Sequence, residues 1–342
     1  AENKKELSIK SNNILTIPML RKGENEMDWR KKKELVIAGV ILFTVFIQVS
    51  CFAAEVEKQE FFVDTETGMK LLVVAKTPQT GRLGQAILLV HGSGVGWVYW
   101  DIPIKNHSIM DYLAKKGLDV YAVECRGYGK STKPNGMEVN ATTMASDLKS
   151  VVKEITKRSG VSKVGMAGHS SAGAVLLVAA GRYPELVERM ILIGAPYKKV
   201  HPSFVAYATK VIEMGKEPGK DYVPNLHYKT VEKRLDAYDD DVVAWYKKIV
   251  EEQYGLMPAG VYPDVIKNPG IPIVSMTKVP TLILNGSNEY VVDPQDALDL
   301  FKDLGSPDKA MIILPGGYHL MFLERKGHVG LQESIFFWMT KK

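Results

Sequence analysis

The segment Gly168–Gly173 (GHSSAG) constrains the fold more than any other feature of this chain. The apolar stretch 161–167 before it predicts a buried strand, and the apolar stretch 174–180 after it predicts a buried helix. A serine between strand and helix, flanked by small residues, indicates a sharp turn, because only small neighbours fit around its strained backbone. Such a turn lifts the hydroxyl clear of the sheet and points the helix N-terminus at a bound anion.

This pattern is typical of a nucleophile elbow, G-x-S-x-G, with Ser170 at its centre. The last position is Ala172, and Gly173 follows it. We place the nucleophile at Ser170 because Gly168 then occupies the point where the backbones crowd most. A register shifted by one residue would make Ser171 the nucleophile. An ordinary strand–turn–helix, with small residues only for packing, is the alternative to a reactive site.

A second glycine-rich loop follows another predicted strand. Residues 86–90 are continuously apolar, as in a strand buried on both faces, and lead into His91–Trp97 (HGSGVGW). The loop lacks the Gly-Lys-Ser/Thr ending of a phosphate-binding P-loop and the spacing of a dinucleotide fingerprint. Bare backbone N–H groups can instead bind an oxyanion. We expect the N–H groups of Ser93 and Ser171 to form such an oxyanion hole.

A third predicted strand, 119–124, is followed by Cys125–Ser131 (CRGYGKS). The order of strand, HG loop, strand, RGxGxS turn, helix, strand and GHSxxG elbow resembles the α/β-hydrolase family, over about residues 60–342. The resemblance implies an α/β fold with a mostly parallel central sheet flanked by helices and a helical cap insertion. It also implies a serine hydrolase of the esterase and lipase type, in which Arg126 is structural.

The resemblance implies the partners of the serine as well, which follow it along the chain as acid and then histidine. The acid lies three residues after the glycine of the turn that follows the predicted strand 281–284, which is Glu289. Asp293 is the alternative acid, although Asp293-Pro294 is typical of a helix N-cap. The histidine is His319, which follows the last predicted strand and a Pro-Gly-Gly turn.

These residues predict an enzyme that cleaves carboxylic esters through an acyl-enzyme on Ser170. His319 accepts the serine proton, and Glu289 orients the imidazole. We expect a small-molecule ester as substrate and no cofactor or metal, because the sequence has no HExxH or CxxC motif. Three alternatives share the fold: a carbon–carbon bond hydrolase, since the HG loop resembles that of meta-cleavage hydrolases, an aminopeptidase, and a non-enzymatic ligand-binding protein.

Residues 197–278 interrupt the strand–helix pattern and are expected to form the cap. Amphipathic helices are predicted at 200–217 and 229–254, followed at 255–275 by a segment rich in proline and glycine that is expected to form a loop or a short helix. A cap excludes water and shapes the substrate pocket. Candidate pocket residues, which could equally pack the cap onto the core, are Phe204, Tyr207, Trp245, Tyr254 and Met257. Candidate acids for binding the amine of a peptidase substrate are Glu232, Asp236, Asp239, Asp240, Asp241, Glu251 and Glu252.

The first 54 residues form a separate region. We expect 1–26 to be a non-native or disordered leader, with Met27 as the true start. Residues 27–54 have the basic start, apolar stretch and small-residue end of a secretory signal peptide, or of an N-terminal anchor if uncleaved. The protein is then secreted, or lies in the periplasm or cell envelope of a bacterium. It contacts membrane only through an uncleaved N-terminal segment.

Length and composition agree with one large α/β domain. The chain has 342 residues, and 46% of them are hydrophobic, which is enough for a full core. We assign the core to 55–196 and 279–342. The net charge of +5 includes +3 from residues 1–54, so that the remainder is nearly balanced and we expect no nucleic-acid partner. Cys125 is the only cysteine after residue 54, which excludes a disulfide within that part.

Overall fold

The computed structural model describes residues 55–342, which are built on one eight-stranded sheet with the strand order β1-β2-β4-β3-β5-β6-β9-β10. All neighbours from β4 to β10 are parallel, whereas β2 pairs antiparallel with β1 and β4. The strands are β1 (Val56–Asp64), β2 (Lys70–Pro78), β3 (Ala86–Val90), β4 (Asp119–Val123), β5 (Val164–His169), β6 (Val187–Ile193), β9 (Thr281–Gly286) and β10 (Lys309–Leu314). The predicted mostly parallel sheet is confirmed.

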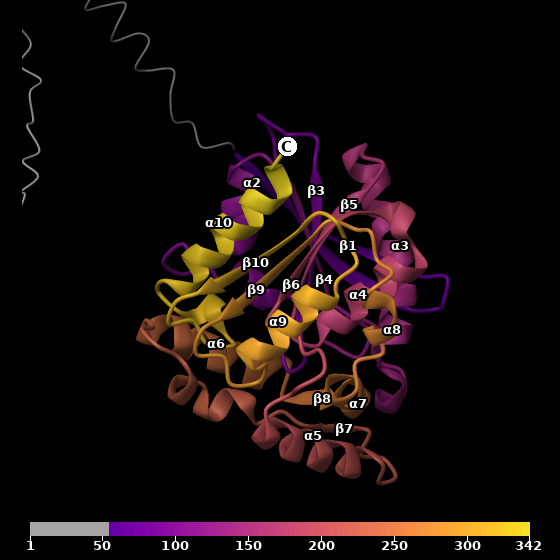
Figure 1. Ribbon diagram of the computed structural model, residues 1–342, viewed down its shortest axis with the longest axis vertical. Helices are drawn as coiled ribbons and strands as arrows, with labels where there is room; N and C mark the ends of the chain where they lie inside the picture. The colour runs from indigo at the N-terminus through magenta and orange to yellow at the C-terminus, as the bar shows by residue number, and fades with distance from the viewer. Residues whose placement is uncertain (1–54) are drawn as a thin grey trace, which may run out of the picture. The chain divides into compact units, whose positions relative to one another are not determined.

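Helices cover both faces of this sheet (Figure 1). Helices α2 (Ile109–Lys115) and α10 (Gly327–Thr340) lie on one face, and α3 (Ala141–Ser159) and α4 (Ala172–Arg182) lie on the other. The central strands β3 and β4 are therefore completely buried, which explains their continuous apolar sequences. Helix α9 (Pro294–Asp303) connects β9 to β10. Because these strands are parallel, the loops that follow β3, β5, β9 and β10 meet at one edge.

The chain between β6 and β9 forms a mainly helical insertion, most of which lies at the lower end of the view in Figure 1. It comprises α5 (Pro202–Gly215), η4 (His227–Arg234), α6 (Asp240–Gln253), η5 (Ala259–Val261), α7 (Tyr262–Ile266), α8 (Ile271–Val274) and a small sheet of β7 (Tyr222–Pro224) and β8 (Leu256–Pro258). Four further 3-10 turns are η1 (Trp97–Asp101), η2 (Gly136–Glu138), η3 (Pro184–Leu186) and η6 (Met321–Leu323). We call the insertion the cap.

The expected continuous helix over 229–254 is wrong. Thr230 leaves helical geometry inside η4, and Leu235 is extended and buried. The chain bends at 236–237, and Tyr238 then forms a β-bridge with Glu324 of the core. Helix α6 begins only at Asp240, with two acidic residues in its first turn that interact favourably with the helix dipole.

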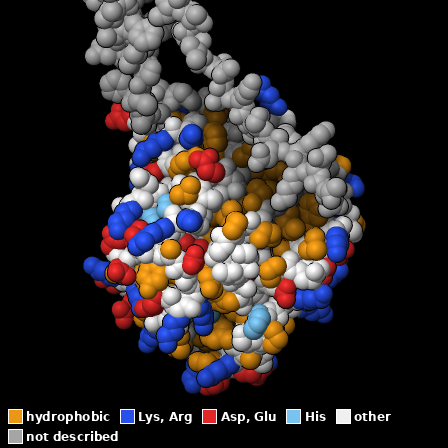
Figure 2. Space-filling model, turned by 60° about the vertical axis from the view of Figure 1, so that its left-hand side comes forward, with side chains coloured by type: hydrophobic (Ala, Val, Ile, Leu, Met, Phe, Trp, Pro, Cys, Tyr) orange, Lys and Arg blue, Asp and Glu red, His pale blue; other side chains and the backbone are white. Residues whose placement is uncertain are grey.

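The surface of the described part mixes charges of both signs. Figure 2 shows Lys and Arg side chains interspersed with Asp and Glu over the face in view. Within residues 55–342, no helix combines the length and apolar character required to cross a membrane. The leader expected at 1–26 and the signal peptide or anchor expected at 27–54 lie outside the described residues.

A buried carboxyl group connects the core to the cap. Glu124 directly follows β4 and accepts hydrogen bonds from the Tyr254 hydroxyl (3.1 Å) and the Trp97 backbone N–H (3.3 Å). A Cβ atom at Gly96 or Gly129 would collide with its oxygens, so both glycines make room for it. Burial raises the pKa of Glu124 to about 7, and the hydrogen bond from Tyr254 opposes this increase only partly.

We predict that Glu124 makes stability depend on pH. Its pKa is about 7 in the folded protein against an ordinary value of 4.5, so the folded state binds the extra proton and stability falls as pH rises from 4.5 to 7. The shift corresponds to about 3 kcal/mol. Glu124→Gln, which keeps the volume without the charge, should raise Tm by roughly 5 °C at pH 8. Calorimetry near pH 4.5 should show almost no difference.

Glu185→Gln is the matched control, because Glu185 is exposed. Its Tm should follow that of the wild type at both pH values. A gain for Glu124→Gln of the same size at pH 4.5 and pH 8 would show that ionisation of this buried group is not its cause.

Candidate active site

Ser170 lies at the turn between β5 and α4 with a left-handed backbone, φ +55°. Such a conformation is strained for a serine and requires small neighbours. A Cβ at Gly92 would lie only 2.9 Å from the His169 carbonyl oxygen, and one at Gly173 would collide with Ala195. Gly168 leaves room for alanine at position 172, because a Cβ atom on residue 168 would lie only 3.1 Å from the Cβ atom of Ala172.

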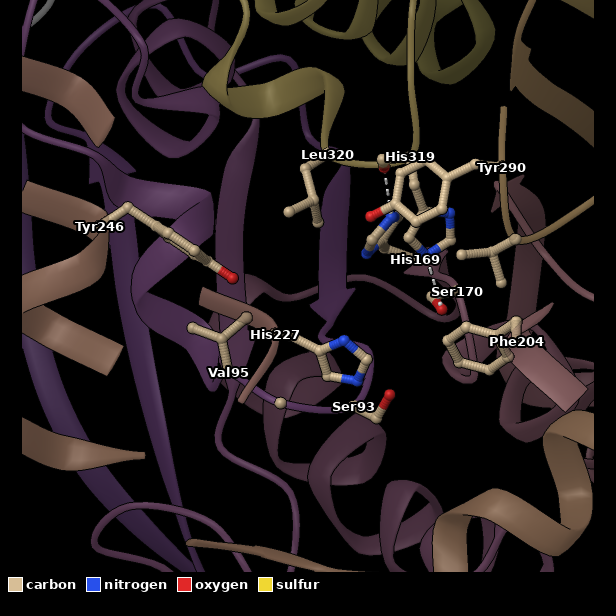
Figure 3. Close-up of a pocket in the computed structure, with 12 residues that line it drawn as sticks. Ser93, Val95, His169, Ser170, Phe204, His227, Tyr246, Tyr290, His319 and Leu320 are labelled. Atoms are coloured by element: carbon tan, nitrogen blue, oxygen red, sulfur yellow. Dashed lines mark hydrogen bonds between the residues drawn. The ribbon is translucent and has the colours of Figure 1, made fainter. Parts of the chain in front are cut away.

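The structure brings Ser170, His319 and Glu289 into one hydrogen-bonded chain. His319 Nε2 lies 2.9 Å from Ser170 Oγ, and Nδ1 lies 2.9 Å from Glu289 Oε2 (Figure 3). Because a carboxylate only accepts, Nδ1 carries the ring proton, and Nε2 accepts the hydrogen bond from the serine hydroxyl. This arrangement can withdraw the serine proton as the oxygen attacks an electrophile.

Glu289 is fixed by the backbone that follows it. Its Oε1 accepts hydrogen bonds from the N–H groups of Tyr290 and Val291, both at 2.9 Å. The side chain is fully buried, which leaves Oε2 directed at His319. The carboxylate thus has a partner on each oxygen and cannot rotate away without breaking one of these hydrogen bonds.

Asp293, the alternative acid, and Ser171, the alternative nucleophile, are not part of this hydrogen-bonded chain. Asp293 Oδ1 accepts a hydrogen bond from the Gln295 N–H at 2.7 Å and caps α9. Ser171 is the N-cap residue of α4, and its side chain is not among those that line the cavity around Ser170.

Two buried histidines hold the loops around Ser170. His169 Nε2 donates a hydrogen bond to the His319 carbonyl oxygen at 2.9 Å, which ties the histidine loop to β5. His91 Nδ1 donates to the Gly92 carbonyl oxygen at 2.8 Å, and Nε2 accepts from the Cys125 N–H at 3.0 Å. Burial lowers the pKa of His91 to about 4 and that of His169 well below its usual range, so both rings are neutral. Burial also raises the pKa of the Cys125 thiol.

The residues of the two predicted oxyanion donors are near Ser170. Ser93 lines the cavity, and the Ser171 N–H lies at the N-terminus of α4. Among residues 55–342, neither N–H donates a hydrogen bond to another part of the protein. Asn225 of the cap donates its side-chain N–H to the Gly94 carbonyl oxygen and to that of Tyr254, which holds the HG loop in place. That the Ser93 and Ser171 N–H groups form an oxyanion hole stays a prediction.

The cavity around Ser170 is small, about 40 Å³. It is lined by Ser93, Gly94, Val95, His169, Ser170, Phe204, His227, Tyr246, Tyr290, Val291, His319 and Leu320. Sequence reasoning assigned no role to His227, which lies across the cavity from Ser170 (Figure 3). Burial lowers the pKa of His227 to about 4, so it presents a neutral ring. We call this space the inner cavity.

A wider space of about 530 Å³ adjoins it and shares the lining residues Phe204, His227 and Tyr290. Its other lining residues are Ser203, Tyr207, Leu226, Lys233, Arg234 and Tyr318. We call it the outer cavity. Of the candidate pocket residues in the cap, Phe204 and Tyr207 line these cavities, whereas Trp245, Tyr254 and Met257 do not.

None of the seven acidic cap residues proposed for an amine lines either cavity. Several are paired elsewhere: Glu232 with Lys247, Asp239 with Arg325, and Asp241 with Lys105. No carboxylate lines either cavity, and Glu289, which is directed at His319, is not among the lining residues.

The family and the two relatives described next are all hydrolases. Residues 84–326 match the family described as serine aminopeptidase, S33. A monoacylglycerol lipase of Mycolicibacterium smegmatis is 24% identical over 278 residues, which cover 80% of this chain and 94% of that protein. A 2-hydroxy-6-oxononadienedioate/2-hydroxy-6-oxononatrienedioate hydrolase of Burkholderia vietnamiensis is 32% identical over 116 residues, 34% of this chain and 38% of that protein.

The fold has close counterparts among solved structures. A soluble variant of the monoglyceride lipase of Saccharomyces cerevisiae superimposes with a TM-score of 0.66 at 19% sequence identity, covering 86% of this chain and 97% of that one. An esterase of Thermogutta terrifontis superimposes with a TM-score of 0.63 at 19% identity, covering 82% and 100%. At these identities the likeness concerns the fold.

We predict that a fluorophosphonate probe labels Ser170. Labelling should be lost in Ser170→Ala and kept in Ser171→Ala, as measured by mass spectrometry of the labelled peptide. Glu289→Gln should slow labelling at least about 100-fold, because an amide can hold the wrong imidazole tautomer and does not stabilise the imidazolium.

Asp293→Asn is the matched control, since it also neutralises a carboxylate in the loop after β9. It should cost at most about 1 kcal/mol of stability through the helix cap and leave the labelling rate unchanged. Slow labelling in Asp293→Asn with normal labelling in Glu289→Gln would assign the acid to Asp293.

Proposed function

The chain belongs to the serine aminopeptidase S33 family of α/β-hydrolases, and within this family we propose that it is a serine carboxylesterase. The hydrogen-bonded chain from Ser170 through His319 to Glu289, opening on a cavity of mixed aromatic, aliphatic and neutral polar lining, is the observation that carries the proposal. The relatives support hydrolysis in general, and the monoacylglycerol lipase among them matches over most of this chain.

In the first half of the proposed reaction, Ser170 Oγ attacks the ester carbonyl carbon while His319 Nε2 takes the hydroxyl proton. The negative charge that develops on the carbonyl oxygen is bound by the N–H groups of Ser93 and Ser171. Losing one such donor typically raises the barrier by about 3–4 kcal/mol. The tetrahedral intermediate then collapses: the bond to the alcohol breaks, His319 returns the proton to the alcohol oxygen, and an acyl-enzyme remains.

In the second half, water replaces the alcohol. His319 takes a proton from the water as its oxygen attacks the acyl carbon, and the proton returns to Ser170 when the acid is released. Glu289 stabilises the imidazolium at each proton transfer and does not itself become protonated.

The lining of the cavities favours an ester over a peptide substrate. An aminopeptidase must bind a substrate ammonium group, yet both cavities lack a free carboxylate. A 2-hydroxy-6-oxo-2,4-heptadienoate hydrolase of Pseudomonas putida is 25% identical over 72% of this chain, against 24% over 80% for the monoacylglycerol lipase. The extent of the match therefore does not separate a carbon–carbon bond hydrolase from an esterase, and the comparison of substrates below does. A purely ligand-binding protein does not require three groups at hydrogen-bond distance in the order that activates a nucleophile.

We also propose that the enzyme is exported, on the composition of residues 27–54. Fractionation of the source cell with mass measurement of the mature protein tests this. A full-length form in the cytoplasm would contradict export, and a full-length form in the membrane would support the anchor.

We predict hydrolysis of 4-nitrophenyl acetate and butyrate, with kcat lowered at least about 10⁴-fold in Ser170→Ala while the circular dichroism spectrum is unchanged. Leucine 4-nitroanilide and a vinylogous diketone should give kcat/KM values at least 100-fold lower than the better ester. If either of these is instead the better substrate, the enzyme is an aminopeptidase or a carbon–carbon bond hydrolase.

A further inference from the structure

The outer cavity carries charge of only one sign. Lys233 and Arg234, at the end of η4, both line it. All its other lining side chains are uncharged. Lys233 is exposed and Arg234 is half-buried. Because no carboxylate lines this cavity, a ligand within it meets a net positive charge.

These two cations differ from several other basic residues of the cap. Lys216, Lys220 and Lys247 each form an ion pair with a nearby glutamate. Within the part of the chain that the structure describes, Lys233 and Arg234 take part in no ion pair. Their charges are thus available to a ligand and are not neutralised by the protein itself.

Arg234 is held in position close to the reacting groups. Its guanidinium lies 5.1 Å from the centre of the Tyr290 ring. Tyr290 in turn packs edge-on against His319, with ring centres 5.8 Å apart, and lines both cavities. A single aromatic ring therefore separates the guanidinium from the imidazole. Stacking over that ring limits the conformations of Arg234 and reduces the entropy lost when it binds an anion.

The charge of Arg234 also reaches the inner cavity. Burial is the main cause of the lowered pKa of His227, and the positive charge of Arg234 lowers it further. His227 lines both cavities, so the field of the guanidinium extends across their junction.

The sizes of the two cavities set how an ester can lie. The inner cavity, at about 40 Å³, holds the ester group and a short substituent. The outer cavity, at about 530 Å³, has room for a longer one. A substrate with its carbonyl at Ser170 therefore extends its longer arm past Phe204, His227 and Tyr290 towards Arg234.

We propose that the outer cavity binds an anionic group, of the carboxylate type, at the end of the longer arm of the ester, with Arg234 as the main contact and Lys233 as a second charge. A guanidinium presents two parallel N–H donors to a carboxylate, which suits this role. The inference rests on the proposed esterase function and narrows its substrates to anionic esters.

Matched esters test the proposal by turnover. One pair places the charge on the acyl arm, 4-nitrophenyl hydrogen suberate against 4-nitrophenyl octanoate. The other places it on the alcohol arm, 6-acetoxyhexanoate against hexyl acetate. For at least one pair, kcat/KM of the anionic ester should exceed that of the neutral ester about tenfold, mainly through KM, and the ratio should fall in 0.5 M salt.

Variants assign the effect to these side chains. Arg234→Gln should bring the ratio close to one, Lys233→Gln should lower it less, and Arg234→Lys should retain part of it. Lys229→Gln is the control, because Lys229 is exposed on the same 3-10 helix and lines neither cavity. If Arg234 only supported Tyr290, its loss would lower both members of a pair equally and leave the ratio unchanged, which would overturn the proposal.

Binding to Ser170→Ala separates this inference from the proposed function. Titration calorimetry with monomethyl suberate and methyl octanoate should show about tenfold tighter binding of the anion, lost in the double variant with Arg234→Gln. If neutral esters are hydrolysed through Ser170 without an anionic preference in turnover or binding, the inference fails and the esterase stands. If no ester is hydrolysed but the anion binds in the Arg234-dependent way, the esterase fails and the anion site stands.

Discussion

The left-handed backbone of Ser170 is the constraint on which the rest of the site depends. A non-glycine residue in this region costs on the order of 1–3 kcal/mol, and the surrounding fold must hold it there. The buried β5 and α4 do so from either side, and the Ser170 N–H donates a hydrogen bond to the Ile193 carbonyl oxygen at 2.8 Å. The neighbouring loops then fit this turn: Gly92 gives the HG loop close access, and His169 ties the histidine loop to it.

Core and cap contribute differently to the site. The core provides the nucleophile, base and acid from loops after parallel strands, so their separation follows from the sheet. The cap provides most of the lining of the outer cavity, with its two cations, and adds Phe204, His227 and Tyr246 to the inner one. The two parts are joined at buried polar contacts, through Asn225 on the HG loop and Tyr254 on Glu124. A change in the cap can therefore alter the oxyanion loop as well as the substrate pocket.

The sequence predicted those parts of the structure whose signal is local. The strands of the core are continuous apolar runs because both sheet faces are covered, and the turn around Ser170 needs small residues. Glu289 and His319 were identified because they follow predicted strands at the positions where the α/β-hydrolase family has its acid and its histidine. The antiparallel hairpin of β1 and β2 was not anticipated, because β1 is largely exposed and its first half is mostly charged or polar.

The cap was harder to predict, since its side chains are directed by contacts distant in sequence. The periodicity over 229–254 is helical, but the β-bridge of Tyr238 to Glu324 interrupts the helix. His227 and Arg234 have no motif around them, and only the fold places them beside Tyr290. The central claim, a covalent acyl-enzyme on Ser170, is tested most directly by rapid acid quenching with a short 4-nitrophenyl ester and mass spectrometry. The account predicts an early adduct of the acyl mass on the peptide containing Ser170; turnover of the ester with no such adduct, or with the acyl group on another residue, would contradict it.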